Sequence, residues 1–319
     1  MHGSWSFDSK WIAYTKITET QFKRVYLYST EQKKSFALTD GLSDASDPKF
    51  DKSGKYLYFF ASTDAGPVIN WFDQSNADMT STNSIYLVTL QKETLSPFAK
   101  ENDEEAIKPD TATAGKPADK KAAPDKKDDQ FRIDWDGIEN RIVDLPVTAG
   151  NYGQLGAGKE GELYYIAYSP DNSGSGMMHK YDLKARKDAE ITAMDGYILS
   201  ADGKKMLYSN GNSWVVTDAG NKPAPGKGNI NTGAIQIKTD PAAEWKNIFE
   251  EAWRVNRDYF YDPGMHGANW TAVKKKYEAF LPDLACRSDL NLLIQWMCSE
   301  LGVGHHRISN PGEIGRAHV

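Results

Sequence analysis

The sequence predicts a mainly β chain with a C-terminal α region: a partial β-propeller of about four blades over residues 1–238, followed by a small helical domain over residues 239–308. Two observations carry this prediction. A turn leading into an aromatic-rich strand recurs through the first part of the chain, and after about Lys238 the spacing of apolar residues changes. Before that point they recur at every second position, as in strands, and after it at every three or four, as in helices.

The propeller prediction rests on the recurring signature. Alternating aromatic and β-branched residues favour strands, and the Asp-Gly and Ser-Gly turns between them provide the backbone freedom that hairpins need. Asp8 and Asp51 lie about 43 positions apart, which is close to the length of one four-stranded blade. The four copies read SFDSKWIAYTK (Ser6–Lys16), FDKSGKYLYFFAS (Phe50–Ser62), a looser AGKEGELYYIAYSP (Ala157–Pro170) and LSADGKKMLYSN (Leu199–Asn210).

Four repeats leave two interpretations of the ring. Propellers typically close with about four to eight blades, so either the first blades of a larger ring are missing or the ring is a short four-bladed one. Residues 100–130 interrupt the pattern, because they contain no aromatic residue and are dense in Lys, Asp, Ala and Pro. This composition predicts a disordered insertion in a blade loop. After it, FRIDWDGIENRIVDLPV (Phe131–Val147) is predicted to resume the strands.

Three helices are predicted beyond the propeller. Asp240 is placed to cap the first, with Pro241 at its first position, and Ser288 is placed to cap the third. Gly302 would end the third helix in a left-handed conformation. The predicted inward residues are Trp245, Ile248, Phe249, Ala252 and Trp253 in the first helix, Trp270, Val273, Tyr277 and Phe280 in the second, and Leu290, Leu293, Ile294, Met297 and Leu301 in the third.

Composition excludes several classes of function. The 319 residues carry a net charge of -6, which argues against nucleic acid as a partner. No apolar run reaches the length of about 18 to 20 residues that a membrane helix needs, and the N-terminus MHGSWSFDSK lacks the pattern of a signal peptide. No nucleotide-binding or calcium-binding motif is present, so we expect no cofactor. Cys286 and Cys298 are too few for a disulfide framework and are predicted to be buried helix thiols.

The stretch CSELGVGHHRIS (Cys298–Ser309) places His305 and His306 just beyond the third helix. Adjacent side chains point in different directions in an extended chain, and no nearby Glu or Cys completes a tetrahedral ligand set, so we expect no metal site. An imidazole titrates near neutral pH and can act as a general base, although loop histidines are more often structural or solvated. From the residues alone, the two histidines are nearly equivalent.

The longer run that begins AEWKNIFEEAWRV and ends ELGVGHHRI (Ala243–Ile308) closely resembles the helical domain of tricorn-like serine proteases, in the superfamily of carboxy-terminal processing peptidases. IDWDGIENRIVDLPVTAGNYGQL (Ile133–Leu155) resembles part of the second propeller of that family, and the resemblance spans nearly the whole chain. In the family, a Glu-Leu-Gly-x-[Ser/Gly]-His segment ends the helical domain. The matching residues here are Glu300, Leu301, Gly302, Val303, Gly304 and His305.

The resemblance implies a peptidase and selects His305 as its catalytic general base, which would take a proton from a serine that attacks the peptide carbonyl. The archetype has a supporting serine where this chain has Gly304, so that support is expected from elsewhere. The nucleophilic serine, the oxyanion donors and a supporting glutamate would lie in a later domain, so the chain alone is expected to be inactive. Peptides are the implied substrates, and a homo-oligomer of the complete enzyme is compatible with the family. A cytoplasmic location is expected, with export as the alternative because the native N-terminus is expected to be missing.

Two other functions compete with this one. The chain would serve as a non-catalytic binding or scaffold module, or as part of a prolyl-oligopeptidase-like hydrolase, which also joins a propeller to a catalytic domain. The second needs a G-x-S-x-G elbow between a strand and a helix, and the sequence has none in such a place. Residues 309–319 are expected to be a truncated linker. Within them, Ile314–Val319 match one reading frame of a common sequencing adapter, so we expect read-through there rather than encoded protein.

Overall fold

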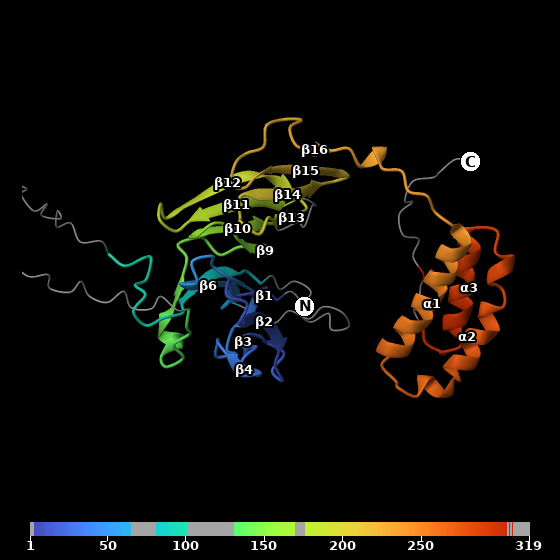
Figure 1. Cartoon of the computed structure of the whole chain (residues 1–319). Coiled ribbons are helices and arrows are strands. Elements are labelled where there is room, and N and C mark those ends of the chain that lie inside the picture. Colours follow the sequence, from blue (N-terminus) through green and yellow to red (C-terminus); the bar gives the residue numbers. More distant parts are fainter. Residues whose placement is uncertain are drawn as a thin grey trace, which may run out of the picture. The chain divides into compact units, whose positions relative to one another are not determined.

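The computed structural model describes residues 3–64, 81–100, 131–169, 176–304, 306 and 308. The chain divides into two compact units, Met1–Gly233 and Ala234–Val319. Within the described ranges, the first unit contains four antiparallel four-stranded sheets and the second contains three α-helices (Figure 1). The predicted fold class, blade-like sheets followed by a C-terminal α region, is confirmed. The predicted insertion beyond Lys100 and the predicted linker at 309–319 lie outside the described residues.

Each sheet is a meander in which strands that follow one another in the chain pair with one another. The first two sheets contain β1 (Ser4–Trp5), β2 (Trp11–Ile17), β3 (Lys23–Ser29) and β4 (Lys34–Ala37), then β5 (Asp44–Phe50), β6 (Tyr56–Ser62), β7 (Ser84–Thr89) and β8 (Ile142–Asp144). The other two contain β9 (Tyr152–Ala157), β10 (Glu162–Ala167), β11 (Gly176–Asp182) and β12 (Lys187–Met194), then β13 (Gly196–Leu199), β14 (Lys205–Asn210), β15 (Ser213–Asp218) and β16 (Asn229–Ile230).

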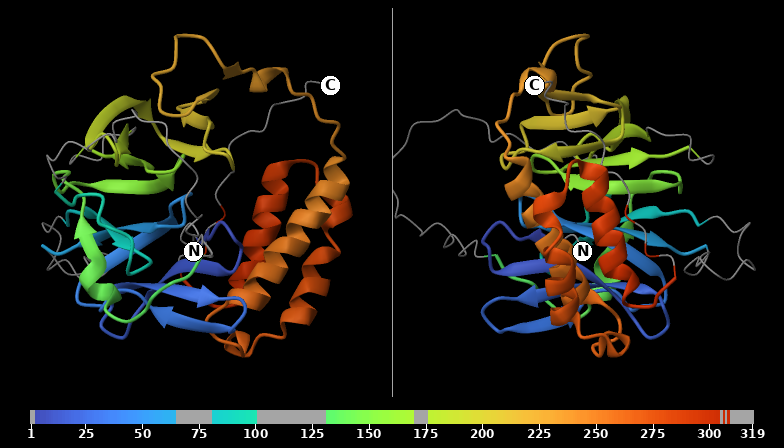
Figure 2. Two further views of the ribbon diagram at one scale, coloured as in Figure 1. Left: turned by 60° about the vertical axis from the view of Figure 1, so that its left-hand side comes forward. Right: turned by 90° about the vertical axis from the view of Figure 1, so that its right-hand side faces the viewer.

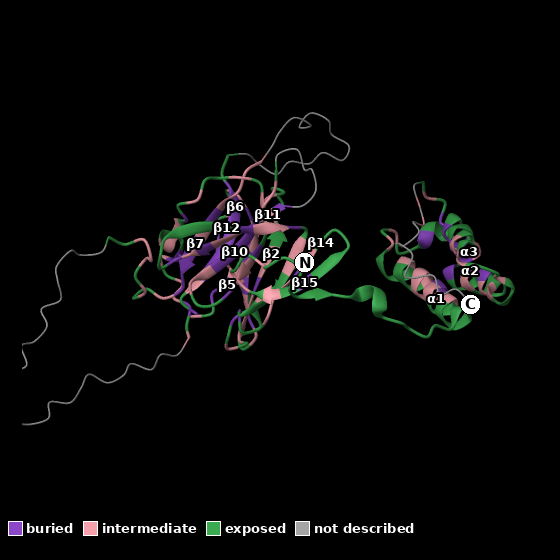
Figure 3. Cartoon of the chain, turned by 90° about the horizontal axis from the view of Figure 1, so that it is seen from above, coloured by how far each residue is buried: buried purple, intermediate pink, exposed green. Residues whose placement is uncertain are grey.

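The second and third sheets are buried on both faces. In β6, Leu57 and Phe59 pack with the apolar residues of the first sheet, whereas Tyr58 and Phe60 pack with those of the third. Alternate side chains of a strand point to opposite faces, so a strand between two neighbouring sheets is apolar at nearly every position. β10 repeats the pattern between the second and fourth sheets, and Figure 3 shows buried residues gathered on these central strands.

The repeated turn signature has a common structure in the first and fourth sheets. The hydroxyls of Ser6 and Ser200 each donate to the carboxylate two residues later, Asp8 and Asp202, at 2.6 Å. Each carboxylate also accepts a backbone N–H two residues further along, at 3.1 and 3.0 Å. Gly203 adopts a φ of 68°, which is why a glycine suits this turn. The same side-chain chemistry therefore closes hairpins far apart in the sequence.

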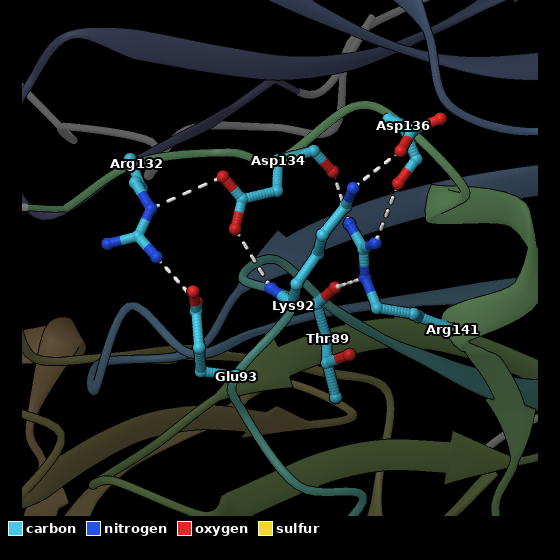
Figure 4. Close-up of polar contacts among 7 residues, drawn as sticks. All are labelled: Thr89, Lys92, Glu93, Arg132, Asp134, Asp136 and Arg141. Carbon is cyan, nitrogen blue, oxygen red and sulfur yellow. Dashed lines mark hydrogen bonds and ion pairs between the residues drawn. The ribbon is translucent and has the colours of Figure 1, made fainter.

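After β7 the chain leaves the second sheet in a long loop and returns to it before β8. The contacts that join the two ends of this loop are called the loop closure (Figure 4). The backbone N–H of Asp134 donates to the Leu90 carbonyl at 2.9 Å, and the N–H of Lys92 donates to the Asp134 carboxylate at 2.9 Å. That bond, followed by the contact with Arg132 at 3.2 Å, lowers the pKa of Asp134. The two ends of the loop are therefore held together by backbone and ionic contacts.

Arg141 completes the loop closure. Its guanidinium donates to the carbonyl oxygens of Thr89 and Asp136, each at 3.1 Å, and also to that of Asp134. One planar group thus ties the end of β7 to the returning chain, which suits the fixed fork of an arginine.

The strand prediction for Phe131–Val147 is wrong for most of its length. Only β8 is a strand, and it is preceded by the 3₁₀ helix η2 (Ile138–Arg141), which Gly137 introduces with a φ of 66°. Phe131 and Trp135 pack against the core of the first two sheets from an irregular segment rather than from a paired strand. An aromatic spacing that suggested a strand is used here to cover a core.

The helical unit contains α1 (Pro241–Tyr259), α2 (Trp270–Glu278) and α3 (Arg287–Ser299), which lie side by side (Figure 2). As predicted, Asp240 caps α1, and its carboxylate accepts from the backbone of Ala242 and Ala243. Three further 3₁₀ helices, η3 (Thr232–Ala234), η4 (Met265–Gly267) and η5 (Leu281–Asp283), complete the described helices. None of the described helices is long and apolar enough to cross a membrane.

Most of the predicted inward residues form the core of this unit, but three predictions fail. Phe280 is 50% exposed, because α2 ends at Glu278 and η5 begins directly after it. The cap of α3 is Cys286 rather than Ser288, and Asp289 completes a capping box with it. Cys286 is therefore exposed and not a buried helix thiol, whereas Cys298 is buried as predicted.

Candidate functional site

The candidate site begins where α3 ends. Leu301 is fully buried, its N–H donates to the Cys298 carbonyl at 3.1 Å, and the N–H of Gly302 donates to the Ser299 carbonyl at 3.0 Å. Gly302 has a φ of 63°, the left-handed conformation predicted for it. The chain thus leaves the helix at a fixed point and continues into the histidine segment.

His305, the predicted general base, lies outside the described residues. Gly304 and His306, on either side of it, are described. Val303 and Ile308 pack against the apolar core of the helical unit. The described parts of the segment therefore follow the surface of the three helices.

A hollow of about 360 Å³ adjoins this segment. It is lined by Val255, Asn256, Tyr259, Phe260, Tyr261, Val303, Gly304 and His306. Tyr259 and Tyr261 are 83% and 73% exposed, so two aromatic side chains stand at its rim. The Nδ1 atom of His306 is buried and has no hydrogen-bond partner within the described part of the chain. The hollow is thus mainly apolar, with one unused imidazole nitrogen.

The glutamate of the matched segment has a structural role. Glu300 Oε1 accepts from Lys276 Nζ at 2.6 Å and from Tyr277 Oη at 2.8 Å. The hydrogen bond from Lys276, then that from Tyr277, lowers the pKa of Glu300. Its carboxylate therefore joins the end of α3 to α2 as an ionised group.

Neither cysteine offers a nucleophile to the site. Burial raises the pKa of Cys298 to about 11, although Asn256 donates a weak hydrogen bond to its sulfur at 3.7 Å. A thiol with such a pKa is almost entirely protonated at neutral pH. Cys286 is at the opposite end of α3, 2.8 Å from Ser288 Oγ. Among the described residues, no group of three or more His, Cys, Asp or Glu side chains could hold a metal ion.

His266 is a residue of this site that the sequence analysis does not identify, because it lies in a connection between two predicted helices. Its Nδ1 lies 2.9 Å from the Leu301 carbonyl oxygen and its Nε2 lies 2.6 Å from Tyr261 Oη. The available signal was a single histidine surrounded by the turn-forming residues of DPGMHGAN. Its partner is 35 residues away, which no local pattern reveals.

The β unit contains a larger hollow of about 960 Å³, lined by β5, β9 and β13 and by Thr15 and Lys23 of the first sheet. Lys23 and Lys49 lie at its wall, paired with Asp44 at 3.3 Å and Asp47 at 2.8 Å. Asp47 also accepts the backbone N–H of Leu155 at 2.7 Å, which links β5 to β9. The wall is thus mainly apolar, and the charges that it carries are paired with carboxylates.

Family comparison decides what the two units are. The family model described as the tricorn protease second beta propeller domain matches residues 2–220, and that of the tricorn protease C1 domain matches residues 241–299. The chain belongs to the tricorn protease family. The resemblance inferred from the residues is therefore confirmed.

Several tricorn relatives are similar to nearly the whole of this chain. Tricorn protease homolog 1 of Streptomyces coelicolor is 27% identical, over 97% of this chain and 30% of its own length. A putative tricorn-like protease C-terminal subunit of Sulfurisphaera tokodaii is 26% identical, over 94% of this chain and 34% of its own. The crystal structure of tricorn protease matches with a TM-score of 0.70 at 20% identity, over 95% of this chain and 29% of that one. The chain thus spans about a third of the relatives it matches.

Proposed function

We propose that the chain is part of a tricorn-type serine peptidase, to which it contributes His305 as the general base. The observation that carries the proposal is the match of α1–α3 to the tricorn C1 domain, at whose end the Glu300–His305 segment follows α3. By the family pattern, His305 would take the proton of a serine hydroxyl as that oxygen attacks a peptide carbonyl, and would then return it to the leaving amine. In this proposal that serine belongs to a later domain of the complete protein.

Gly304 shapes this proposal. It has no side chain to support the imidazole of His305, and apart from its two chain neighbours no atom of the described residues lies within 4 Å of where a Cβ would stand. The orientation of the base must therefore come from the backbone on either side and from groups in contact with it.

The rest of the proposal concerns the complete protein. Its domains in this part of the chain are the propeller at 1–238 and the helical domain at 239–308. Its substrates are peptides, its assembly is a homo-oligomer, and its location is cytoplasmic, with export as the alternative.

The test uses the complete reading frame that contains this chain. His305→Ala should lower kcat for a peptide substrate by about 10⁴-fold or more, because a triad-type serine loses its base. His306→Ala is the matched control and should retain most of the activity. The reverse result would place the base one residue later, and full activity in both variants would refute the assignment. The 319-residue chain alone should hydrolyse nothing.

A peptide-binding role for the β unit is the second candidate, favoured by the hollow of about 960 Å³ with lysines and aspartates at its wall. In this second proposal the chain is a binding or scaffold module without catalysis. The 319-residue chain should then bind fluorescent peptides, and Lys49→Ala should weaken the binding. Anisotropy measures both. Unchanged kcat in the His305→Ala variant of the complete protein, together with such binding, would favour the module over the peptidase.

A further inference from the structure

We propose that His266 is a positioning residue, which holds the Leu301 carbonyl and so fixes the start of the segment that carries His305. The inference rests on the proposed function, because it gives that base an orienting contact on another loop. Three features support it: the backbone of the η4 loop, the two nitrogens of His266, and the glycines that follow Leu301.

The backbone of the η4 loop is held in an unusual conformation. Asp262 accepts the N–H of His266 at 2.8 Å and that of Gly264 at 3.0 Å. Met265, His266 and Gly267 have φ values of 53°, 52° and 82°. Positive φ is uncommon for residues other than glycine, and it persists where surrounding contacts determine it. Here the Asp262 carboxylate and the buried side chain of Met265 supply those contacts.

Both nitrogens of the His266 ring are used. A carbonyl oxygen can only accept, so Nδ1 carries a proton and donates it to Leu301. In the neutral ring Nε2 is then an acceptor, and the hydroxyl of Tyr261 donates to it. The ring also makes an edge contact with Phe260, with centroids 5.2 Å apart. Its rotation is thus fixed from three sides.

The carbonyl that His266 binds lies two residues beyond the end of α3, so the helix itself offers it no hydrogen bond. A buried carbonyl needs a partner, and the His266 ring supplies it. Leu301 is fully buried, so its side chain and its carbonyl are both fixed. Beyond it come Gly302 and Gly304, and a Cβ added to either would meet no atom of the described residues within 4 Å, apart from its chain neighbours. Leu301 is the last residue held at both side chain and carbonyl before these glycines, so the direction of the segment is set there.

Two substitutions at position 266 distinguish the clamp, which is the hydrogen bond from His266 to the Leu301 carbonyl, from the folding of the loop. In His266→Asn, the amide nitrogen occupies about the place of Nδ1 and can still donate to Leu301, and asparagine tolerates positive φ. In His266→Gln, the amide reaches the place of Nε2, near Tyr261, and leaves the Leu301 carbonyl without its donor. Tyr261→Phe removes only the hydroxyl behind the ring.

The first measurement uses the 319-residue chain and needs no activity. Hydrogen exchange of the peptide that spans residues 300–306 should be about tenfold faster in His266→Gln and close to wild type in His266→Asn. Exchange within α1, α2 and α3 should stay unchanged in both. Equal exchange of residues 300–306 in wild type and His266→Gln would overturn the clamp.

The second measurement uses the complete protein. His266→Gln should lower kcat about 10- to 100-fold with KM unchanged, because a displaced base slows the chemistry and not the binding of substrate. His266→Asn should restore most of the rate. A merely structural role would lower the amount of folded enzyme without this split, and such a result would overturn the inference.

The two proposals fail separately. If His305→Ala leaves kcat intact, the proposed function is wrong, while the exchange measurement still judges the contact of His266 with Leu301. If His305→Ala abolishes activity but His266→Gln behaves as wild type in exchange and in rate, the base stands and the positioning role is refuted.

Discussion

Replacing Asp51 by Ala should weaken the contact between the second and third sheets. The Asp51 side chain is 1% exposed, and its Oδ2 accepts from Tyr58 Oη and from the backbone N–H of Gly161, both at 3.0 Å. Its Oδ1 accepts the N–H of Ser53 at 2.9 Å. One carboxylate thus joins β6 to the turn between β9 and β10.

The magnitude follows from what the substitution leaves unpaired. Among the donors that lose their acceptor, two join the sheets, the buried hydroxyl of Tyr58 and the N–H of Gly161, and each unpaired group costs about 1–3 kcal/mol. The free energy of unfolding of the β unit should fall by about 3 kcal/mol. Tyr58→Phe should cost about 1 kcal/mol, and in that background Asp51→Ala should cost about 1 kcal/mol less, because one of the two orphaned donors is already gone.

The assay is urea unfolding of the 319-residue chain. Pulsed hydrogen exchange of peptides from β6, β7 and β10 measures the unfolding at each urea concentration. Peptides from α1–α3 serve as an internal control and should keep their wild-type midpoint. A loss below about 1 kcal/mol in Asp51→Ala, or fully additive costs in the double variant, would refute the argument that this carboxylate links the two sheets.

Three further predictions concern the loop closure, the reactivity of the two thiols and the pH dependence of stability. Arg141→Lys should lower the free energy of unfolding of the second sheet by about 1–2 kcal/mol, since an ammonium cannot reproduce three carbonyl contacts from one plane, while the exposed Arg132→Lys should change it little in the same urea assay; equal effects would contradict this. Iodoacetamide at pH 8 should modify Cys286 rapidly and Cys298 only on unfolding, as mass spectrometry would show. Because burial raises the Cys298 pKa from 9.0 to about 11, the stability it contributes is present below pH 9 and is lost as pH rises towards 11, and Cys298→Ala should remove that slope.

More of the fold than of the site could be predicted from the sequence. YLYFFAS (Tyr56–Ser62) is apolar at nearly every position, as a strand between two sheets must be, so the repeats predicted the sheets well. The strand prediction for Phe131–Val147 is wrong because aromatic residues also cover cores from irregular segments. The cap of α3 misled because Ser288 has the usual side chain for a cap, whereas Asp289 selects Cys286 by bonding back to its N–H.

The site was predictable only in part, because its contacts join distant residues. The left-handed conformation of Gly302, beyond the end of α3, follows from local chemistry, and the structure agrees with it. The contact of His266 with Leu301 spans 35 residues and depends on how the η4 loop folds, which periodicity does not encode. His305 differs from His306 only through the family pattern, and the choice between them stays a prediction.

The loop closure between β7 and β8 has a practical consequence for engineering. The backbone bond from Asp134 to Leu90, at 2.9 Å, brings the exit and the return of the chain together at one point of the second sheet. The cost of closing a loop rises only slowly with its length once its ends are fixed. A guest domain whose own ends lie close together could therefore be grafted between them, and the sheet would serve as a carrier for sensors or affinity modules.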